Sequence, residues 1–177
     1  LTNESDAPKS FTVFSYVEFC LWNAVDDSTN FQRNFSTGEV EVEGSTIYHK
    51  TEYRERRDHY ALYTVNAPVD GFDTSRDAFL GAWRSNANPE VVEKGACTNS
   101  VAHGWAPVGV HQINVTLNPG ESRSLIYMLG YIENPQEEKW AAPGVINKTR
   151  AHELMARYAT DAQVDEALAK LHAHWNS

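Results

Sequence analysis

The chain has 177 residues and a net charge of −9, from 24 acidic and 15 basic side chains. This is the length of one domain, or of one domain with an appendage. The acidic balance argues against a nucleic-acid partner, because phosphate binding needs a basic footprint, and no apolar run is long enough to span a membrane.

Period-two patterns predict antiparallel β-structure in the first two-thirds of the chain. Residues 11–20 alternate with aromatic side chains on both faces, which is typical of a strand inside a sandwich. Residues 39–43 alternate Glu and Val, and we expect residues 46–51 to pair with them across Gly44 and Ser45. Such short, regularly spaced strands indicate a sandwich or a barrel. Further strands are expected at residues 61–65, 109–117 and 122–131.

Turn chemistry explains several polar residues without any catalytic role. Pro119 and Gly120 predict a turn between the last two strands, because Pro fixes φ and Gly permits positive φ. Asp70, Gly71 and Asp73 are interpreted as loop residues for the same reason.

The pattern becomes helical towards the end of the chain. Residues 135–146 resemble a linker, and Asn147 is the expected N-cap of a helix reaching about residue 159. Thr160 or Asp161 is expected to cap a second helix. We therefore predict a mainly β fold, an antiparallel β-sandwich over residues 1–134, followed by two C-terminal α-helices within residues 135–177. The apolar stripe of the second helix contains Val164, Ala167, Leu168, Leu171 and Trp175.

The cysteines and histidines predict neither a metal site nor a disulfide scaffold. Cys20 and Cys97 form no CxxC pair, and reduced thiols in the cytoplasm are the default for such a chain. The spacing of His49 and His59 matches no common ligand set, and the Arg and Glu residues between them suit ion pairing instead. His103 and His111 fall in or near a predicted strand and are expected to be hydrogen-bonded structural residues rather than ligands.

Four tryptophans have the chemistry to stack on sugar rings, although Trp in a sandwich is more often found in the core or an interface. They are Trp22, Trp83, Trp105 and Trp140.

The segment 30–34 carries more hydrogen-bonding capacity than a turn needs. Its Arg33 offers five donors in a planar fork, and Asn30, Gln32 and Asn34 add amides. Such a cluster suits a hydroxyl-rich or anionic ligand.

Five runs of sequence have a distinctive composition: residues 18–24, 30–34, 49–59, 72–81 and 117–121. These runs resemble the N-terminal region of the cellobiose phosphorylases of glycoside hydrolase family 94. The resemblance covers most of residues 1–135 and is weaker over the helical tail.

The resemblance implies an N-terminal β-sandwich of the super-sandwich type, linker helices and a large helical barrel. Such an enzyme cleaves cellobiose with phosphate as co-substrate, giving α-glucose 1-phosphate and glucose with inversion. Its catalytic acid and phosphate ligands would lie in the barrel, so we assign no catalytic residue, metal or cofactor to this chain. Because the chain begins at Leu1, we expect it to be a piece of a longer polypeptide.

The resemblance further implies a homodimer in which this domain lends a loop to the active site of the neighbouring subunit. Gln32 and Arg33 match the tip of that loop and are the expected substrate-binding residues. Three alternatives stay open: a stand-alone carbohydrate-binding module, a purely structural domain, and a related chitobiose or cellodextrin phosphorylase.

Overall fold

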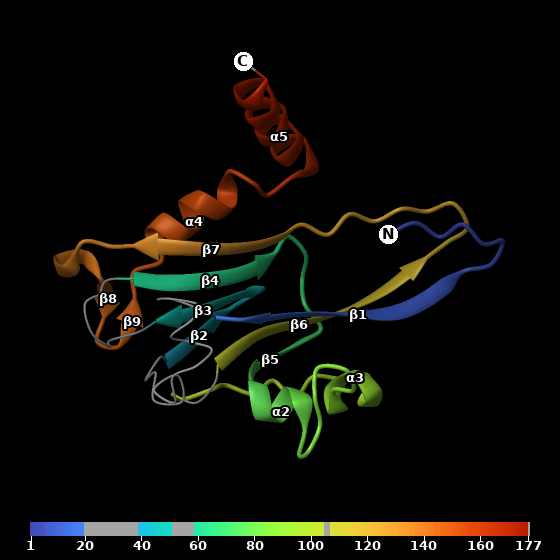
Figure 1. Ribbon diagram of the computed structural model, residues 1–177, viewed down its shortest axis with the longest axis horizontal. Coiled ribbons are helices and arrows are strands. Elements are labelled where there is room, and N and C mark those ends of the chain that lie inside the picture. Colours follow the sequence, from blue (N-terminus) through green and yellow to red (C-terminus); the bar gives the residue numbers. More distant parts are fainter. Residues whose placement is uncertain (20–38, 51–58, 105–106, 177) are drawn as a thin grey trace.

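The structure, a computed structural model, describes residues 1–19, 39–50, 59–104 and 107–176. Two antiparallel sheets pack face to face, and short helices lie on their outer sides (Figure 1). This arrangement confirms the predicted mainly β fold, an antiparallel sandwich followed by two C-terminal helices.

The larger sheet contains β2 (Glu39–Glu43), β3 (Thr46–Lys50), β4 (His59–Val65) and β7 (Tyr127–Glu133), hydrogen-bonded in the order β2-β3-β4-β7. The predicted turn between β2 and β3 is confirmed, and Gly44 adopts a φ of 57° there, a value that glycine takes without strain. The register places Glu39 opposite Lys50 and His59 opposite Glu133, so these residues share one end of the sheet.

The smaller sheet contains β1 (Lys9–Glu18), β6 (Pro107–Leu117) and β5 (Gly71–Ser75), in the order β1-β6-β5. β1 and β6 pair along their whole length, from Lys9 opposite Leu117 to Glu18 opposite Val108. The pairing of β5 with β6 shifts between Asp73 and Ser75.

The interpretation of Gly71 and Asp73 as loop residues is wrong, because both lie in β5. Gly and Asp are poor strand formers by propensity, but here the side chains of Asp73 and Thr74 bond to the neighbouring segment. Thr74 Oγ1 accepts from the amide of Ala102 at 2.8 Å and donates to the carbonyl of Ser100 at 3.0 Å. These contacts override local propensity.

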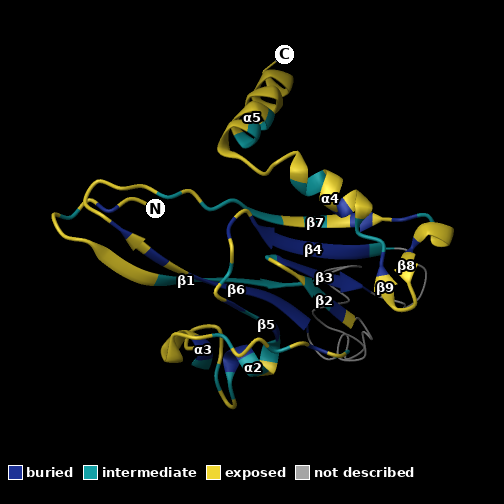
Figure 2. Cartoon of the chain, turned by 180° about the vertical axis from the view of Figure 1, so that it is seen from behind, coloured by how far each residue is buried: buried dark blue, intermediate teal, exposed yellow. Residues whose placement is uncertain are grey.

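The space between the sheets is filled mostly by apolar and aromatic side chains. Tyr63 of β4 stacks on His111 of β6 with ring centroids 4.8 Å apart. Gly109 permits this close approach, because a Cβ there would lie 2.8 Å from Tyr63 Cδ1. β3 and β4 are the most deeply buried strands (Figure 2). Buried residues of this interior include Ile47, Val65, Ile113, Val115 and Leu117.

The outer face of the larger sheet is covered by the chain after β7. This chain forms the 3-10 helix η2 (Gln136–Glu138), the hairpin β8 (Trp140–Ala142) and β9 (Val145–Ile146), and the helix α4 (Thr149–Ala156). Ile146 and Ala151 are buried in one cluster with Tyr48 and Leu62. Residues beyond 134 therefore contribute to a hydrophobic cluster on the outer face of the larger sheet, and the domain boundary placed there stays a prediction.

The predicted strand at residues 122–131 is only partly right. β7 begins at Tyr127, and Ser122 instead forms an isolated bridge with Thr2. The turn at Pro119 and Gly120 consequently links strands of different sheets, because β6 lies in the smaller sheet and β7 in the larger.

Two short helices, α2 (Arg76–Leu80) and α3 (Glu90–Lys94), follow β5 and pack on the smaller sheet. Phe79, Leu80 and Val91 are buried there with Val108 and Val110.

The C-terminal helix α5 (Asp161–Trp175) extends away from the sheets (Figure 1). Thr160 caps it as predicted, through a reciprocal capping box with Gln163. None of its described residues is buried, and Leu168, Leu171 and Trp175 of the predicted stripe are exposed. Among the described helices, none is long and apolar enough to cross a membrane.

Candidate functional site

One end of the sandwich carries the strand ends that flank residues 20–38 and 51–58. β1 ends at Glu18 and β2 begins at Glu39, while β3 ends at Lys50 and β4 begins at His59. Cross-strand pairing brings Glu39, Lys50 and His59 to the same end of the larger sheet. We call this region, defined by Glu18, Glu39, Lys50 and His59, the loop-bearing end.

The two sheets are joined at the loop-bearing end. A bridge pairs Glu39 with His103, and Phe19 stacks on His49 at 5.2 Å between ring centroids. The expected substrate-binding residues Gln32 and Arg33 lie outside the described residues. The structure describes the strand ends on either side of the segment that contains Gln32 and Arg33, and the contacts that hold these strand ends.

Lys50 is the most deeply buried cation of this framework, with 5% of its side chain exposed. Its Nζ lies 3.0 Å from Glu39 Oε2 and 3.1 Å from Glu41 Oε1, and it also donates to the carbonyl of Gly144. Burial by itself lowers the pKa of Lys50, but the two carboxylates outweigh it and raise this pKa above its usual value. Lys50 therefore remains charged, with each of its three protons directed at an acceptor.

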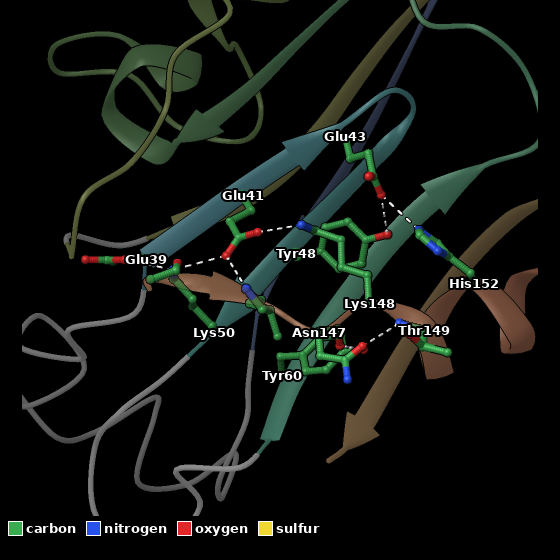
Figure 3. A network of polar contacts seen from close by, with 12 residues as sticks. Glu39, Glu41, Glu43, Tyr48, Lys50, Tyr60, Asn147, Lys148, Thr149 and His152 are labelled. Atoms are coloured by element: carbon green, nitrogen blue, oxygen red, sulfur yellow. Dashed lines mark hydrogen bonds and ion pairs between the residues drawn. The ribbon is translucent and has the colours of Figure 1, made fainter. Parts of the chain in front are cut away.

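Glu41 connects Lys50 to the outer hairpin. Glu41 Oε2 lies 2.6 Å from Lys148 Nζ, and Oε1 accepts from the amide of Ile146 at 2.9 Å (Figure 3). Burial raises the pKa of Glu41, but hydrogen bonds from Lys148, Ile146 and Lys50 outweigh it and hold this pKa below its usual value. An ionised Glu41 thus ties together β2, β3 and β9.

Glu43, two residues after Glu41 in β2, makes a similar connection to α4. It lies 2.9 Å from His152 Nε2 of α4 and accepts from the hydroxyl of Tyr48 at 3.3 Å. The hydrogen bond from His152 is the main cause that lowers the pKa of Glu43. Figure 3 shows Glu39, Glu41 and Glu43 along one side of β2, directed at this set of partners.

Asn147 fixes the start of α4 against the sheet. Its carbonyl oxygen accepts from the hydroxyl of Tyr60 at 3.1 Å and from Nδ2 of Asn134 at 3.0 Å. Its side chain accepts from the amide of Thr149 at 3.1 Å, although the N-cap position itself is occupied by Lys148. The prediction that Asn147 caps this helix is therefore one residue out, yet its side chain does bond the first turn.

This network holds charge in place but is not suited to proton transfer. Cleavage of a glycosidic bond needs a carboxylic acid whose raised pKa keeps it protonated. Glu41 and Glu43 have lowered pKa values and are ionised, so neither is such an acid. Among the described residues, no group of three His, Cys, Asp or Glu side chains is arranged to hold a metal ion. The described network acts as a support.

Two histidines lie inside the sandwich rather than at a site. His49 and His111 are buried, and within the described part of the chain neither ring has a hydrogen-bonded nitrogen. Burial lowers the pKa of each to about 4, so both rings are neutral at pH 7. His111 is a structural residue as predicted, but the expectation that its ring is hydrogen-bonded is wrong, and stacking against Tyr63 holds the ring instead.

Sequence reasoning missed the role of Asp73, which is fully buried. Its Oδ1 accepts from the hydroxyls of Thr98 and Ser100 at 2.5 and 2.6 Å, and from the amide of Ser100 at 2.9 Å. Asn99, between Thr98 and Ser100, has a φ of 56°, so these two hydroxyl residues form no strand pattern that could have pointed to the contact. The effect of the contact is to attach the segment after α3 to β5.

The two described tryptophans among the four candidates have different settings. Trp140 is partly exposed, with Lys139 Nζ 4.5 Å and Lys50 Nζ 5.1 Å from its ring centre. Trp83 is fully exposed in the connection between α2 and α3. Trp22 and Trp105 lie outside the described residues.

Comparisons with known proteins fit this architecture. Residues 1–161 match the family described as "Glycosyl hydrolase 94, supersandwich domain". The N,N'-diacetylchitobiose phosphorylases of Vibrio furnissii and Vibrio proteolyticus are 29% and 32% identical to the chain over 99% of its length. The solabiose phosphorylase of Paenibacillus borealis is 28% identical over 97%.

The chain spans only 20% of the length of the two Vibrio relatives and 23% of the Paenibacillus relative. The match to the family covers every described strand, from β1 to β9, and extends through α4. The chain belongs to the glycosyl hydrolase 94 supersandwich-domain family.

Proposed function

We propose that this chain is the non-catalytic supersandwich region of an inverting glycoside phosphorylase. The observation that carries the proposal is the family match over residues 1–161, together with relatives named as phosphorylases. Phosphate would attack the anomeric carbon of a disaccharide while a barrel acid protonates the leaving oxygen, giving an α-sugar 1-phosphate. The ionised state of Glu41 and Glu43 agrees with a domain that supplies no such acid.

The substrate we propose is a β-linked disaccharide, and N,N'-diacetylchitobiose is the first candidate. The resemblance of the sequence to cellobiose phosphorylases does not distinguish the members of the family. Relatives named as diacetylchitobiose phosphorylases align over 99% of the chain, which favours the acetylated sugar over cellobiose. Phosphorolysis of both sugars by the longer protein, with release of sugar 1-phosphate as the readout, separates the two.

The proposal includes a homodimer in which Gln32 and Arg33 complete the neighbour's active site. Its support is the sequence resemblance and the anchoring of the flanking strands. Glu18 lies 3.1 Å from Arg76 Nε, and Glu39 lies 3.0 Å from Lys50 Nζ. Strand ends fixed in this way suit a loop that must reach a set position. A cytoplasmic location belongs to the same proposal, and Cys97 is a free thiol.

Subunit mixing tests the contribution in trans. One subunit carries Arg33→Ala, and the other carries an inactivating substitution of its barrel acid. Random assortment should restore about a quarter of the wild-type phosphorolysis, because only mixed dimers contain one complete site. No activity after mixing would show that Arg33, if it acts at all, acts within its own subunit. Arg33→Lys should restore little activity, because Lys lacks the planar fork of donors.

A further inference from the structure

Trp83 combines two unfavourable features in one residue. Its side chain is fully exposed, and its φ of 61° lies in the left-handed region that bulky residues avoid. The other described non-glycine residue with positive φ is Asn99, and Asn tolerates this conformation well. A large apolar ring in a strained backbone, with no packing in return, points to a role in binding.

The connection that carries Trp83 is held by its own contacts. The amide of Gly81 donates to the carbonyl of Asp77 at 2.9 Å, ending α2. The amide of Asn88 donates to the carbonyl of Ser85 at 3.0 Å, and Asn88 Oδ1 accepts from the Ser85 amide at 3.2 Å. Because the backbone of this connection is already ordered, it loses little conformational entropy when a ligand binds to the Trp83 ring.

A groove of about 560 Å³ adjoins this connection. Arg84, next to Trp83 in the chain, forms an ion pair with Glu93, and both residues line the groove. Guanidinium, carboxylate and amide groups together offer donors and acceptors for vicinal hydroxyls. The groove is lined by Arg84, Ala87, Asn88, Pro89, Val92 and Glu93.

We propose that Trp83 and this groove form a saccharide-binding surface. The indole ring packs on the C–H face of a pyranose, while Arg84, Asn88 and Glu93 bond its hydroxyls. A protein partner fits less well, because a groove of about 560 Å³ has the size of a small-molecule site, whereas a stable protein interface buries on the order of 1,200–2,000 Å². The proposal does not depend on the phosphorylase activity, since the binding is measured on this chain without turnover.

The test is an NMR titration of the 177-residue chain with cellobiose and with N,N'-diacetylchitobiose. We expect saturable shifts of the Trp83 indole N–H and of the Arg84 and Asn88 amides. Sorbitol, which has hydroxyls but no ring face, should give none. Trp83→Ala should weaken binding by about tenfold or more. Trp175→Ala is the matched control, because Trp175 is also exposed but lies at the end of α5, and it should leave the affinity unchanged.

A second variant separates binding from folding. Trp83→Gly should raise the melting temperature, because glycine adopts positive φ freely, and should still lose saccharide binding. Trp83→Phe keeps an aromatic face and should retain most of the affinity.

Three results would overturn the proposal. The first is that neither sugar saturates, or that Trp83→Ala binds as the parent chain does. The second is a lower melting temperature for Trp83→Gly, which would make Trp83 a structural residue. The third is self-association that depends on Trp83, measured by sedimentation, which would show that the surface binds a second copy of the chain.

Discussion

Lys50 Nζ lies 3.1 Å from Glu41 Oε1, with 5% of the Lys50 side chain and 18% of the Glu41 side chain exposed. This pair joins β2 to β3 at the loop-bearing end, and Gly144 and Lys148 extend it to the outer hairpin. Removal of Lys50 would leave Glu41 with Lys148 as its remaining cation and would break the ionic connection between β2 and β3. The framework under the flanking strand ends is therefore fixed by charge as well as by packing.

Lys50→Met should destabilise the fold by about 1.5–3 kcal/mol, because Glu41 loses one of its two cations and keeps only Lys148, while the mostly exposed Glu39 is solvated. Urea unfolding at pH 7 measures the loss. Lys94→Met is the matched control, because Lys94 pairs with Glu90 on the exposed side of α3. The control should unfold as the parent chain does, and equal losses in the two variants would contradict the assigned role of Lys50.

Asp73→Asn should cost about 1.5–3 kcal/mol, because the new amide presents donors to groups that already donate. The amides of Thr98 and Ser100 both bond the Asp73 carboxylate, so their hydrogen exchange should accelerate more than that of the strand amides of β4. Asp165→Asn on the exposed side of α5 serves as the control. Unchanged protection of Thr98 and Ser100 would show that the segment is held by other contacts.

The sequence predicted strands well where alternation and turn residues agree, and it failed where distant contacts decide. The turn at Gly44 and the cap at Thr160 are local features, and both were predicted correctly. β5 was missed because the bonds that make Asp73 and Thr74 part of a strand come from residues more than 20 positions away. No local pattern contains that information.

The candidate site shows the same limit. The alternation of Glu and Val in β2 predicted a half-exposed strand, but two partners of Glu41, Ile146 and Lys148, lie about 100 positions further on, in β9 and before α4. The exposure and backbone strain of Trp83 are also invisible in the sequence, because an Ala-Trp-Arg segment carries no signal for positive φ.

Acid should destabilise the fold through His49 and His111. Burial lowers the pKa of each from 6.5 to about 4 in the folded chain. Between these values the unfolded chain binds protons that the folded chain does not. Stability is therefore full above pH 6.5 and falls as the pH drops towards 4, by about 1.4 kcal/mol per pH unit for each histidine.

Urea unfolding at pH 7, 6 and 5 measures this slope. The window stays above the range in which Glu41 and Glu43 lose their ion pairs, because their pKa values are lowered below 4.5. His111→Phe should reduce the slope by about half, because one of the two buried histidines no longer takes part. His172→Gln on exposed α5 should leave it intact, and an equal slope in both variants would contradict the assignment.

Gly109→Ala should separate the two sheets. A Cβ at Gly109 would lie 2.8 Å from Tyr63 Cδ1, 3.0 Å from Val17 Cγ2 and 3.3 Å from Phe19 Cζ, so at least one side chain must move. Overpacking of this kind costs about 1–3 kcal/mol, and ring-current shifts should change at His111, which stacks on Tyr63.

Gly130→Ala is the matched control for this substitution. A Cβ there would lie no closer than 3.2 Å to its nearest neighbour, Leu62 Cγ, so a small movement of the Leu62 and Leu154 side chains accommodates it. Thermal unfolding should therefore rank the parent chain and Gly130→Ala close together and Gly109→Ala clearly below them. If the two variants lose equal stability, the contact between Gly109 and Tyr63 does not set the spacing of the sheets.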